Sequence, residues 1–259
     1  MARQRRPDDI RQGALFTGSR PRRPVVRPGR RAGTRRTPTP IRTPGKKIWL
    51  SATGIETHRR CPRCFWLQYN LRIYQPEGIV SRLANRFDGV IKRYFDLYRG
   101  TNELPPLVAG QVVGRLESPF QELYFATLNQ RYGFKGKLDE CLVRPDGRYT
   151  PVDHKTASSD PNTREIIPAY QFQLDSYAWL LGQNEKPTSG LGHLIYFYPA
   201  ESQHLHQGFP MEVTIKTLTT KPTSVRPILE QAISLLEGPL PAPADDCPFC
   251  LYVEQVKRF

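Results

Sequence analysis

The stretch from Tyr132 to Ser158 reads YGFKGKLDECLVRPDGRYTPVDHKTAS and predicts two β-strands joined by a tight turn. The first strand is expected over residues 134–143, where apolar and polar side chains roughly alternate. The turn is residues 144–147, Arg-Pro-Asp-Gly, in which proline presets φ and Asp-Gly tolerates the left-handed backbone of a hairpin. The returning strand, residues 149–152, leads directly into Asp153-His154-Lys155.

Two aspartates lie at similar distances from this turn. Asp139 precedes the turn and Asp153 follows it, so antiparallel pairing brings their carboxylates close together. Neighbouring carboxylates repel each other unless a cation or a proton intervenes. Lys155 is two residues beyond Asp153 and therefore projects to the same face of the strand. The stretch predicts a site for a hard cation with an ammonium group beside it.

A surface hairpin with scattered charges is the simpler interpretation, because Asp-x-Lys alone occurs in many proteins. The combination of patterns is more specific. Gly136 begins Gly-x-x-Asp139 on one strand, Asp-x-Lys follows on its partner, and the next helix carries Gln173 and Tyr177. These last two residues are four apart and share one face of the helix. A tyrosine at such a position is usually part of the core, but with the hairpin upstream we expect both residues to line the site.

This combination resembles the RecB-type nuclease domain of the PD-(D/E)XK superfamily, and it is similar to the CRISPR-associated RecB-like exonucleases. The resemblance covers roughly residues 49–252. It implies an α/β fold with a restriction-endonuclease-like core, in which helices flank a mixed central β-sheet. It also implies a metal-dependent nuclease that hydrolyses the phosphodiester bonds of DNA.

The resemblance implies a set of ligands for a catalytic cation. Asp139, Asp153 and the main-chain carbonyl of His154 would hold Mg²⁺ or Mn²⁺. The cation would acidify a bound water and neutralise charge on the phosphate oxygens.

The resemblance also implies roles for the remaining site residues. Lys155 would orient the attacking water and offset developing charge. Gln173 would hydrogen-bond the water, Lys155 or the phosphate, and Tyr177 would shape the wall of the site. With these two on the helix, the expected catalytic set is Asp139, Asp153, Lys155, Gln173 and Tyr177.

An amphipathic helix is expected from about Arg82 to Arg99, because apolar residues recur there at 3.6-residue spacing. RecB-type nucleases usually carry a histidine on this helix near the metal. Lys92 stands at roughly that position here, with Asp88 one turn before it. Either residue could point into the site, but an ordinary solvated i, i+4 ion pair is the favoured interpretation.

Two Cys-x-x-Cys pairs lie near the two ends of the expected domain, Cys61 with Cys64 and Cys247 with Cys250. Four thiolates can close a tetrahedral zinc site or hold an iron–sulfur cluster. Two unrelated pairs are the alternative, but their matching Cys-Pro-x-Cys contexts favour one shared metal that staples the N- and C-terminal parts together. Cys141, in the hairpin, is expected to be a small buried apolar residue.

The resemblance bears on the metal at these cysteines. RecB-type relatives often hold a 4Fe–4S cluster with one upstream cysteine and three near the C-terminus. This chain has two and two, so the expected 4Fe–4S cluster has structural Zn²⁺ as its alternative.

Charge divides the 259-residue chain into two parts. Residues 1–47 carry 13 Arg and 2 Lys against two Asp, whereas residues 48–259 are close to neutral. The N-terminal part also has seven prolines and few apolar residues, so we expect a disordered tail followed by one nuclease domain. The tail's arginines would attract phosphate backbones without sequence preference; a solubility tail or an address signal is the alternative.

Other features limit location and partners. The chain shows no secretory signal and no apolar run long enough for a membrane span, so we expect a cytoplasmic protein. DNA, single- or double-stranded, is the expected partner, and other proteins of a DNA-processing complex are further candidate partners. The alternative function is a nucleic-acid-binding module, or a nuclease-like subunit of a larger complex with little activity alone.

The rest of the expected secondary structure frames the hairpin. Residues 100–118 are expected to form a loop, and residues 119–129 are compatible with either a helix or a strand. The other expected elements are helices over residues 51–61, 164–181 and 224–236 and strands over residues 191–198 and 212–218.

Overall fold

The structure is a computed structural model, and it describes residues 40, 46–76, 81–201, 208 and 210–259. All of these residues belong to one unit of the chain. Most of the predicted disordered tail, residues 1–47, lies outside the described residues, so its disorder stays a prediction.

Six α-helices lie in the described part of the chain. They are α1 (Ala52–Arg60), α2 (Pro62–Leu71), α3 (Ser81–Asp96), α4 (Pro168–Gln183), α5 (Val225–Glu237) and α6 (Pro248–Val256). Two 3₁₀ turns, Pro161–Thr163 and Pro222–Ser224, precede α4 and α5. Ser51 caps α1 by accepting the backbone N–H of Gly54 at 3.2 Å, as expected for a serine at this position.

The strands form two mixed sheets. The strands are β1 (Ile48–Leu50), β2 (Arg115–Leu116), β3 (Leu123–Thr127), β4 (Tyr132–Lys137), β5 (Glu140–Val143), β6 (Tyr149–Thr156), β7 (Leu191–Pro199) and β8 (Met211–Thr219). The smaller sheet has the order β1-β4-β3 and the larger the order β2-β5-β6-β7-β8. In each sheet one neighbouring pair is parallel, β1 with β4 and β6 with β7.

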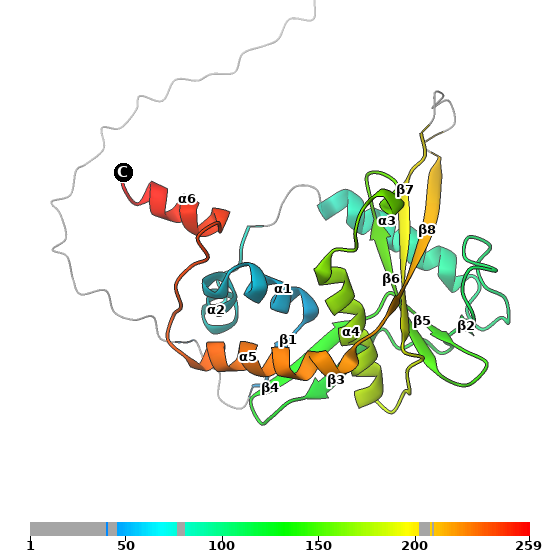
Figure 1. Cartoon of the computed structure of the whole chain (residues 1–259), viewed down its shortest axis with the longest axis horizontal. Coiled ribbons are helices and arrows are strands. Elements are labelled where there is room, and N and C mark those ends of the chain that lie inside the picture. Colours follow the sequence, from blue (N-terminus) through cyan, green and yellow to red (C-terminus); the bar gives the residue numbers. More distant parts are fainter. Residues whose placement is uncertain (1–39, 41–45, 77–80, 202–207, 209) are drawn as a thin grey trace, which may run out of the picture. The chain divides into compact units, whose positions relative to one another are not determined.

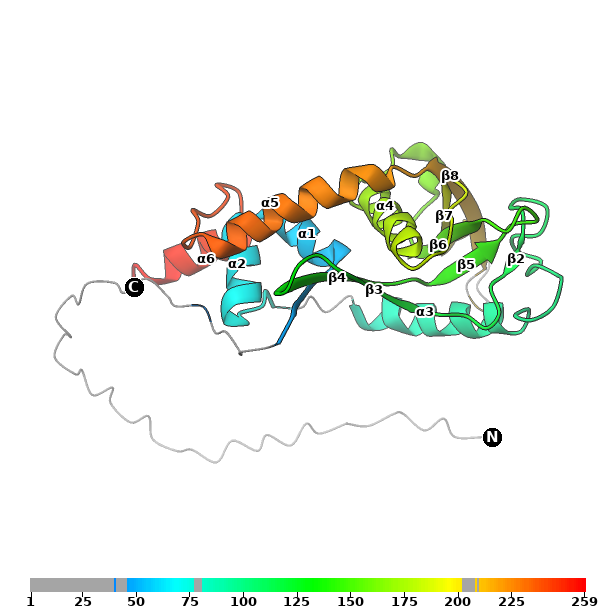
Figure 2. The same ribbon diagram turned by 90° about the horizontal axis from the view of Figure 1, so that it is seen from below.

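Helices cover both sides of the strands. Figure 1 shows α4 and α5 close together beside the sheets, and Figure 2 shows α3 on the opposite side. The larger hydrophobic core includes Leu174 of α4 and Leu229 of α5, both fully buried. A second core packs Phe95 of α3 against Ile195 of β7. This arrangement confirms the predicted α/β class with a mixed sheet flanked by helices.

The predicted hairpin is confirmed, but its first strand is not continuous. β5 pairs antiparallel with β6, with Glu140 opposite Val152. β4, however, ends before Leu138 and belongs to the smaller sheet, so the chain crosses between the two sheets at Leu138 and Asp139. Continuing the β5–β6 register places Asp139 opposite Asp153.

Other elements also differ from the prediction or extend it. α4 begins at Pro168, four residues after the predicted start, because the residue before a proline disfavours helical backbone and Ile167 is extended. The ambiguous segment 119–129 contains the strand β3. Neither α2 nor α6 was predicted from the sequence. Among the helices that the structure describes, none is both long and apolar enough to cross a membrane.

The glycine of the Gly-x-x-Asp pattern permits a close approach of β4 to α4. A Cβ atom at Gly136 would lie 2.6 Å from Cδ1 of Leu180 and 3.3 Å from the ring of Tyr177. Leu180 is fully buried and cannot move aside freely.

We therefore expect Gly136→Ala to lower the free energy of unfolding by about 1–3 kcal/mol, measured by urea denaturation. Gly182→Ala, on the same helix, is the matched control, because a Cβ there would meet no described atom within 4 Å. That variant should be as stable as the wild type or slightly more stable. Equal stability of Gly136→Ala and wild type would contradict the packing argument.

Candidate active site

The predicted site residues come from three places in the fold. Asp139 lies at the crossing between the sheets, Asp153 and Lys155 lie near the end of β6, and Gln173 and Tyr177 lie on α4. The structure brings all five side chains together, and we call them the Asp153 network. Because α4 packs across β6 and β4, one turn of this helix reaches both the strand and the crossing.

Lys155 connects the strand to the helix. Its Nζ lies 2.5 Å from Oδ2 of Asp153 and donates to Oε1 of Gln173 at 2.8 Å. The ring of Tyr170, on the first turn of α4, lies beneath the same ammonium at 4.4 Å from its centroid. Tyr170 was not predicted as a site residue, because its contact with Lys155 depends on how α4 lies against β6. Three groups therefore hold the lysine, and one of them is the buried carboxylate of Asp153.

Tyr177 fixes the other end of the network. Its hydroxyl accepts from Nε2 of Gln173 at 2.7 Å and donates to the carbonyl of Lys137 at 2.9 Å. The hydroxyl also lies 3.5 Å from Oδ1 of Asp153. Burial raises the pKa of Tyr177 well above its usual value, so the phenol stays neutral and continues to donate.

Asp139 contacts both the strand and α3. Its Oδ2 accepts the backbone N–H of His154 at 3.0 Å, and its Oδ1 lies 2.9 Å from Nζ of Lys92. Lys92 also lies 3.1 Å from Oδ2 of Asp88. The i, i+4 pair is therefore present, but its interpretation as an ordinary surface pair is wrong, because Lys92 reaches the site. Burial alone would lower the pKa of Lys92, but Asp139 and Asp88 raise it above its usual value.

Asp153 carries the strongest electrostatic constraint. Its side chain is 1% exposed, and burial raises the pKa of this carboxyl to about 6. Lys155 acts in the opposite direction, and the charge of Asp139 adds to the increase. A divalent cation at the two aspartates would favour both ionised carboxylates. Since carboxylates are also the ligands that Mg²⁺ and Mn²⁺ prefer, this donor set fits such a cation.

The four predicted cysteine ligands also come together, and we call them the four-cysteine centre. The Sγ atom of Cys64 lies 3.7 Å from those of Cys247 and Cys250, and that of Cys61 lies 3.9 Å from that of Cys250. All four sulfur atoms lie within 4.8 Å of one another. The centre can therefore bind a metal, and it joins α2 to the start of α6. Cys141 is fully buried on β5, as predicted, and burial raises the pKa of its thiol.

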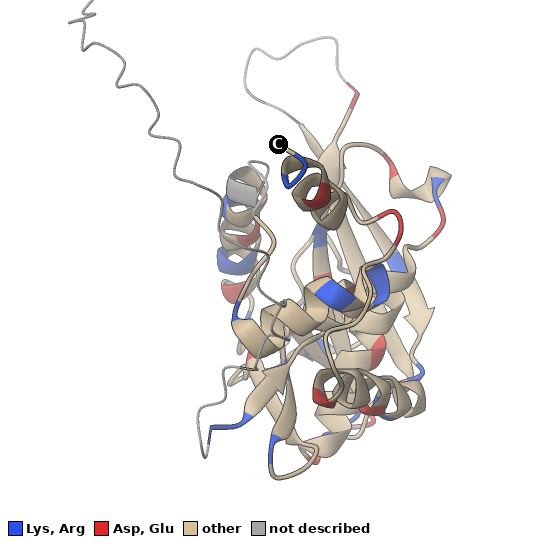
Figure 3. Ribbon diagram, turned by 90° about the vertical axis from the view of Figure 1, so that its left-hand side faces the viewer, with Lys and Arg blue, Asp and Glu red and all other residues tan. Residues whose placement is uncertain are grey.

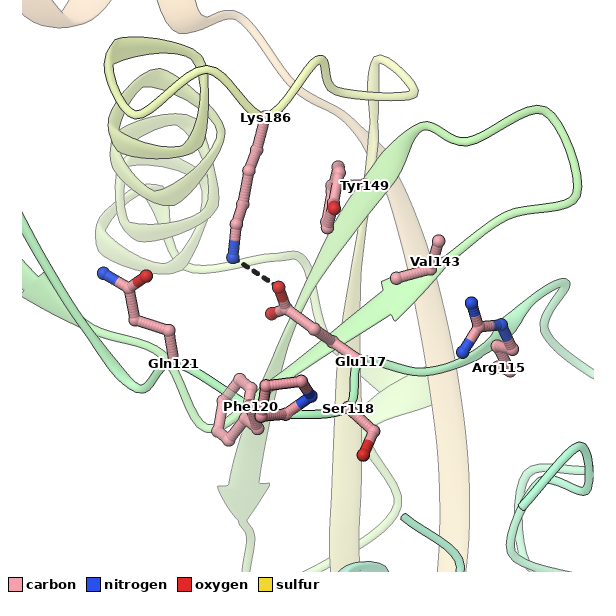
Figure 4. Close-up of a pocket in the computed structure, with 9 residues that line it drawn as sticks. Arg115, Glu117, Ser118, Phe120, Gln121, Val143, Tyr149 and Lys186 are labelled. Atoms are coloured by element: carbon pink, nitrogen blue, oxygen red, sulfur yellow. Dashed lines mark hydrogen bonds and ion pairs between the residues drawn. The ribbon is translucent and has the colours of Figure 1, made fainter. Parts of the chain in front are cut away.

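A separate pocket of about 400 Å³ lies at the opposite end of β6, beside Tyr149 (Figure 4). Glu117 and Lys186 point toward each other across it and form an ion pair. Lys186 also donates to the hydroxyl of Tyr124 at 2.5 Å. The described residues that line this pocket include none of the Asp153 network, and its two facing charges neutralise each other.

Comparison with known proteins supports the interpretation of the site. The model of the PD-(D/E)XK nuclease superfamily matches residues 108–255, more than half of the chain. The fold is similar to that of a solved structure described as SSO0001, at 17% identity and a TM-score of 0.42, covering 75% of this chain and 80% of that one.

It is also similar to a phage-related exonuclease from Haemophilus somnus 129PT, at 12% identity and a TM-score of 0.40, covering 68% and 78%. No curated protein matches the chain. The range matched by the superfamily model contains the whole Asp153 network. The chain belongs to the PD-(D/E)XK nuclease superfamily.

Proposed function

We propose that this protein is a Mg²⁺- or Mn²⁺-dependent deoxyribonuclease of RecB-like type. The observation that carries the proposal is the ion pair between Lys155 and the buried Asp153, with Asp139 opposite. A purely structural hairpin has no need for a buried carboxylate with a second carboxylate beside it. Each separate charge would cost free energy on burial, whereas a cation-binding site uses all of them together.

Each residue of the network has a proposed task. Asp139, Asp153 and the carbonyl of His154 would hold the cation, which when bound supplies an acidified water and neutralises phosphate charge. Lys155 would donate to the attacking water or to a phosphate oxygen, because its ammonium is already fixed beside Asp153. Gln173 would keep the ammonium in place.

Two rival functions belong to different classes. In one, the chain is a nucleic-acid-binding module; in the other, it is a nuclease-like subunit with little activity outside a complex. The complete Asp153 network favours an active enzyme over both. Chelation of divalent cations separates the classes, since binding by a module should survive chelation and cleavage should not.

For the four-cysteine centre we propose a single tetrahedral zinc ion. Zinc–thiolate bonds of roughly 2.3 Å place the sulfurs of a tetrahedral site about 3.8 Å apart. Three of the sulfur pairs lie 3.7 to 3.9 Å apart, close to this value, and all four sulfurs lie within 4.8 Å of one another. In a 4Fe–4S cluster each cysteine binds a different iron atom at a corner of the cube, so the sulfurs are much further apart. The spacing supports the zinc alternative over the iron–sulfur cluster that the resemblance implied.

The basic tail is proposed to bind DNA phosphates. In the view of Figure 3, basic and acidic residues are interspersed over the described part of the chain. Residue counts place the excess positive charge of the protein in residues 1–47, because residues 48–259 are close to neutral. Counterion release by these arginines would add affinity without sequence preference.

The first prediction from the proposed function tests the active site. Asp139→Asn, Asp153→Asn and Lys155→Met should each lower the rate of DNA cleavage in Mn²⁺ by about 100-fold or more, because each removes a charged group from the reacting centre. The rates are measured on end-labelled and internally labelled DNA, single- and double-stranded, with RNA of the same sequence as a comparison.

Lys137→Met is the matched control for these variants. Its ammonium is exposed and pairs with the exposed Glu122, so cleavage should stay at the wild-type rate. Circular dichroism should show an unchanged fold in all four variants. Wild-type cleavage by the network variants would exclude the assigned site, and a wild-type protein that cuts none of the DNA substrates would exclude the deoxyribonuclease itself.

The second prediction concerns the four-cysteine centre. The isolated protein should be colourless and contain about one zinc per chain, and Cys247→Ser/Cys250→Ser should lose the metal and unfold at lower temperature. Cys141→Ser is the control and should keep the metal. A brown protein with about four iron per chain would identify the cluster instead, and metal retained by the double variant would exclude a shared centre.

The third prediction concerns the tail. Deleting residues 1–45 removes 13 arginines against two aspartates and should weaken DNA binding and flatten its salt dependence. The single-turnover rate at saturating enzyme should be nearly unchanged, because the network lies elsewhere. Fluorescence anisotropy over a salt series measures the DNA affinity and its salt dependence. A full-length variant with the tail arginines changed to glutamine should behave like the deletion; an unchanged salt slope in both proteins would show that the tail does not bind DNA.

A further inference from the structure

The side chain of His154 lies on the opposite side of β6 from Asp153 and Lys155. Alternation along the strand directs it toward α3, where its ring lies 4.7 Å from that of Phe95 and 5.8 Å from that of Phe197. It is only 9% exposed.

Neither ring nitrogen of His154 has a hydrogen-bond partner among the residues that the structure describes. A buried polar atom without a partner costs free energy, and a histidine at a purely structural position normally finds one. His193 on the neighbouring strand differs, because one of its two nitrogens has a partner: Nδ1 lies 2.9 Å from the hydroxyl of Thr217, and only Nε2 has none among the described residues. The free nitrogens of His154 therefore indicate a ligand.

Two carboxylates stand next to this imidazole. One ligand atom each from Asp88, Asp139 and His154 lie within 4.8 Å of one another. A cavity of about 240 Å³ opens beside them and is lined by Asp88, His154, Lys155 and Tyr170, among others. The cavity has room for a hydrated ion, and it reaches the ammonium of Lys155.

We propose that Asp88, Asp139 and the His154 imidazole form a second divalent-cation site that accepts Mn²⁺ in preference to Mg²⁺. An imidazole nitrogen suits the transition metals, whereas Mg²⁺ selects oxygen ligands. Asp139 is shared with the cation of the proposed function, and the inference rests on that function for this shared role. The two cations would flank one aspartate, as in two-metal phosphodiester hydrolysis.

Lys92 contacts two of the three proposed ligands. Its ammonium lies between Asp88 and Asp139 and neutralises the same carboxylates that the cation would bind. A lysine has a long flexible stem, so this ammonium can withdraw when a divalent ion enters. Lys92 is thus the internal counter-ion of the metal-free site.

The test is pulsed EPR of the full chain loaded with Mn²⁺, which detects a nitrogen nucleus bonded directly to the ion. We expect a nitrogen coupling in the wild type, its loss in His154→Gln, and Mn²⁺ affinity about ten- to a hundredfold weaker in that variant. Asp88→Asn should weaken Mn²⁺ binding as well; its side chain is 44% exposed, so the substitution is compatible with folding. His193→Gln, at an equally buried histidine, should keep both the coupling and the affinity.

The measurement separates this site from the proposed function. Asp153→Asn should abolish cleavage but keep the nitrogen coupling, since Asp153 is not among the three ligands. A wild-type spectrum without nitrogen coupling, or a coupling that survives in His154→Gln, would overturn the second site whatever the variants do to cleavage. Normal cleavage by Asp153→Asn would overturn the proposed function and leave the EPR result standing.

Discussion

The burial of Asp153 is the constraint on which the other features of the site depend. A carboxylate with 1% exposure is ionised only when charged or hydrogen-bonding groups surround it, and here Lys155 and Tyr177 do so. Tyr177 reaches the carboxylate because α4 lies close against β4, and that approach requires the missing side chain at Gly136. Gly136 and Asp139 therefore act at the same place. The missing side chain of Gly136 lets α4 pack close to β4, and Asp139 lies opposite the buried carboxylate of Asp153.

The end of β6 has ionisable side chains on both of its sides. Asp153 and Lys155 face α4, while His154 between them faces α3. Asp139 at the sheet crossing accepts the backbone N–H of His154 through one oxygen and contacts Lys92 of α3 through the other. A residue in a regular strand interior would face one side only. The break between β4 and β5 thus frees Asp139 from the alternation of a strand, so it can lie opposite Asp153 and still reach α3.

Local patterns predicted the parts of the site that depend on spacing within one element. The turn at residues 144–147, the shared face of Asp153 and Lys155, and the i, i+4 relation of Gln173 and Tyr177 all follow from strand and helix periodicity. Contacts between distant elements could not be obtained in this way. The approach of Lys92 to Asp139 depends on how α3 lies against the sheet, and the break at Leu138 depends on a pairing of β4 with β1 and β3 that no local pattern encodes.

The four-cysteine centre follows a different physical rule from the rest of the fold. Helix α6 has no buried residue within the described part of the chain, and Leu251, Tyr252 and Val253 on it are exposed. Hydrophobic burial therefore contributes little to holding this helix, although α4 and α5 depend on it. Cys247 and Cys250 are the groups that attach α6 to Cys61 and Cys64. A metal bound at these four cysteines would take the place of a hydrophobic core and fix the position of α6, whereas the Asp153 network is built by packing and ion pairs.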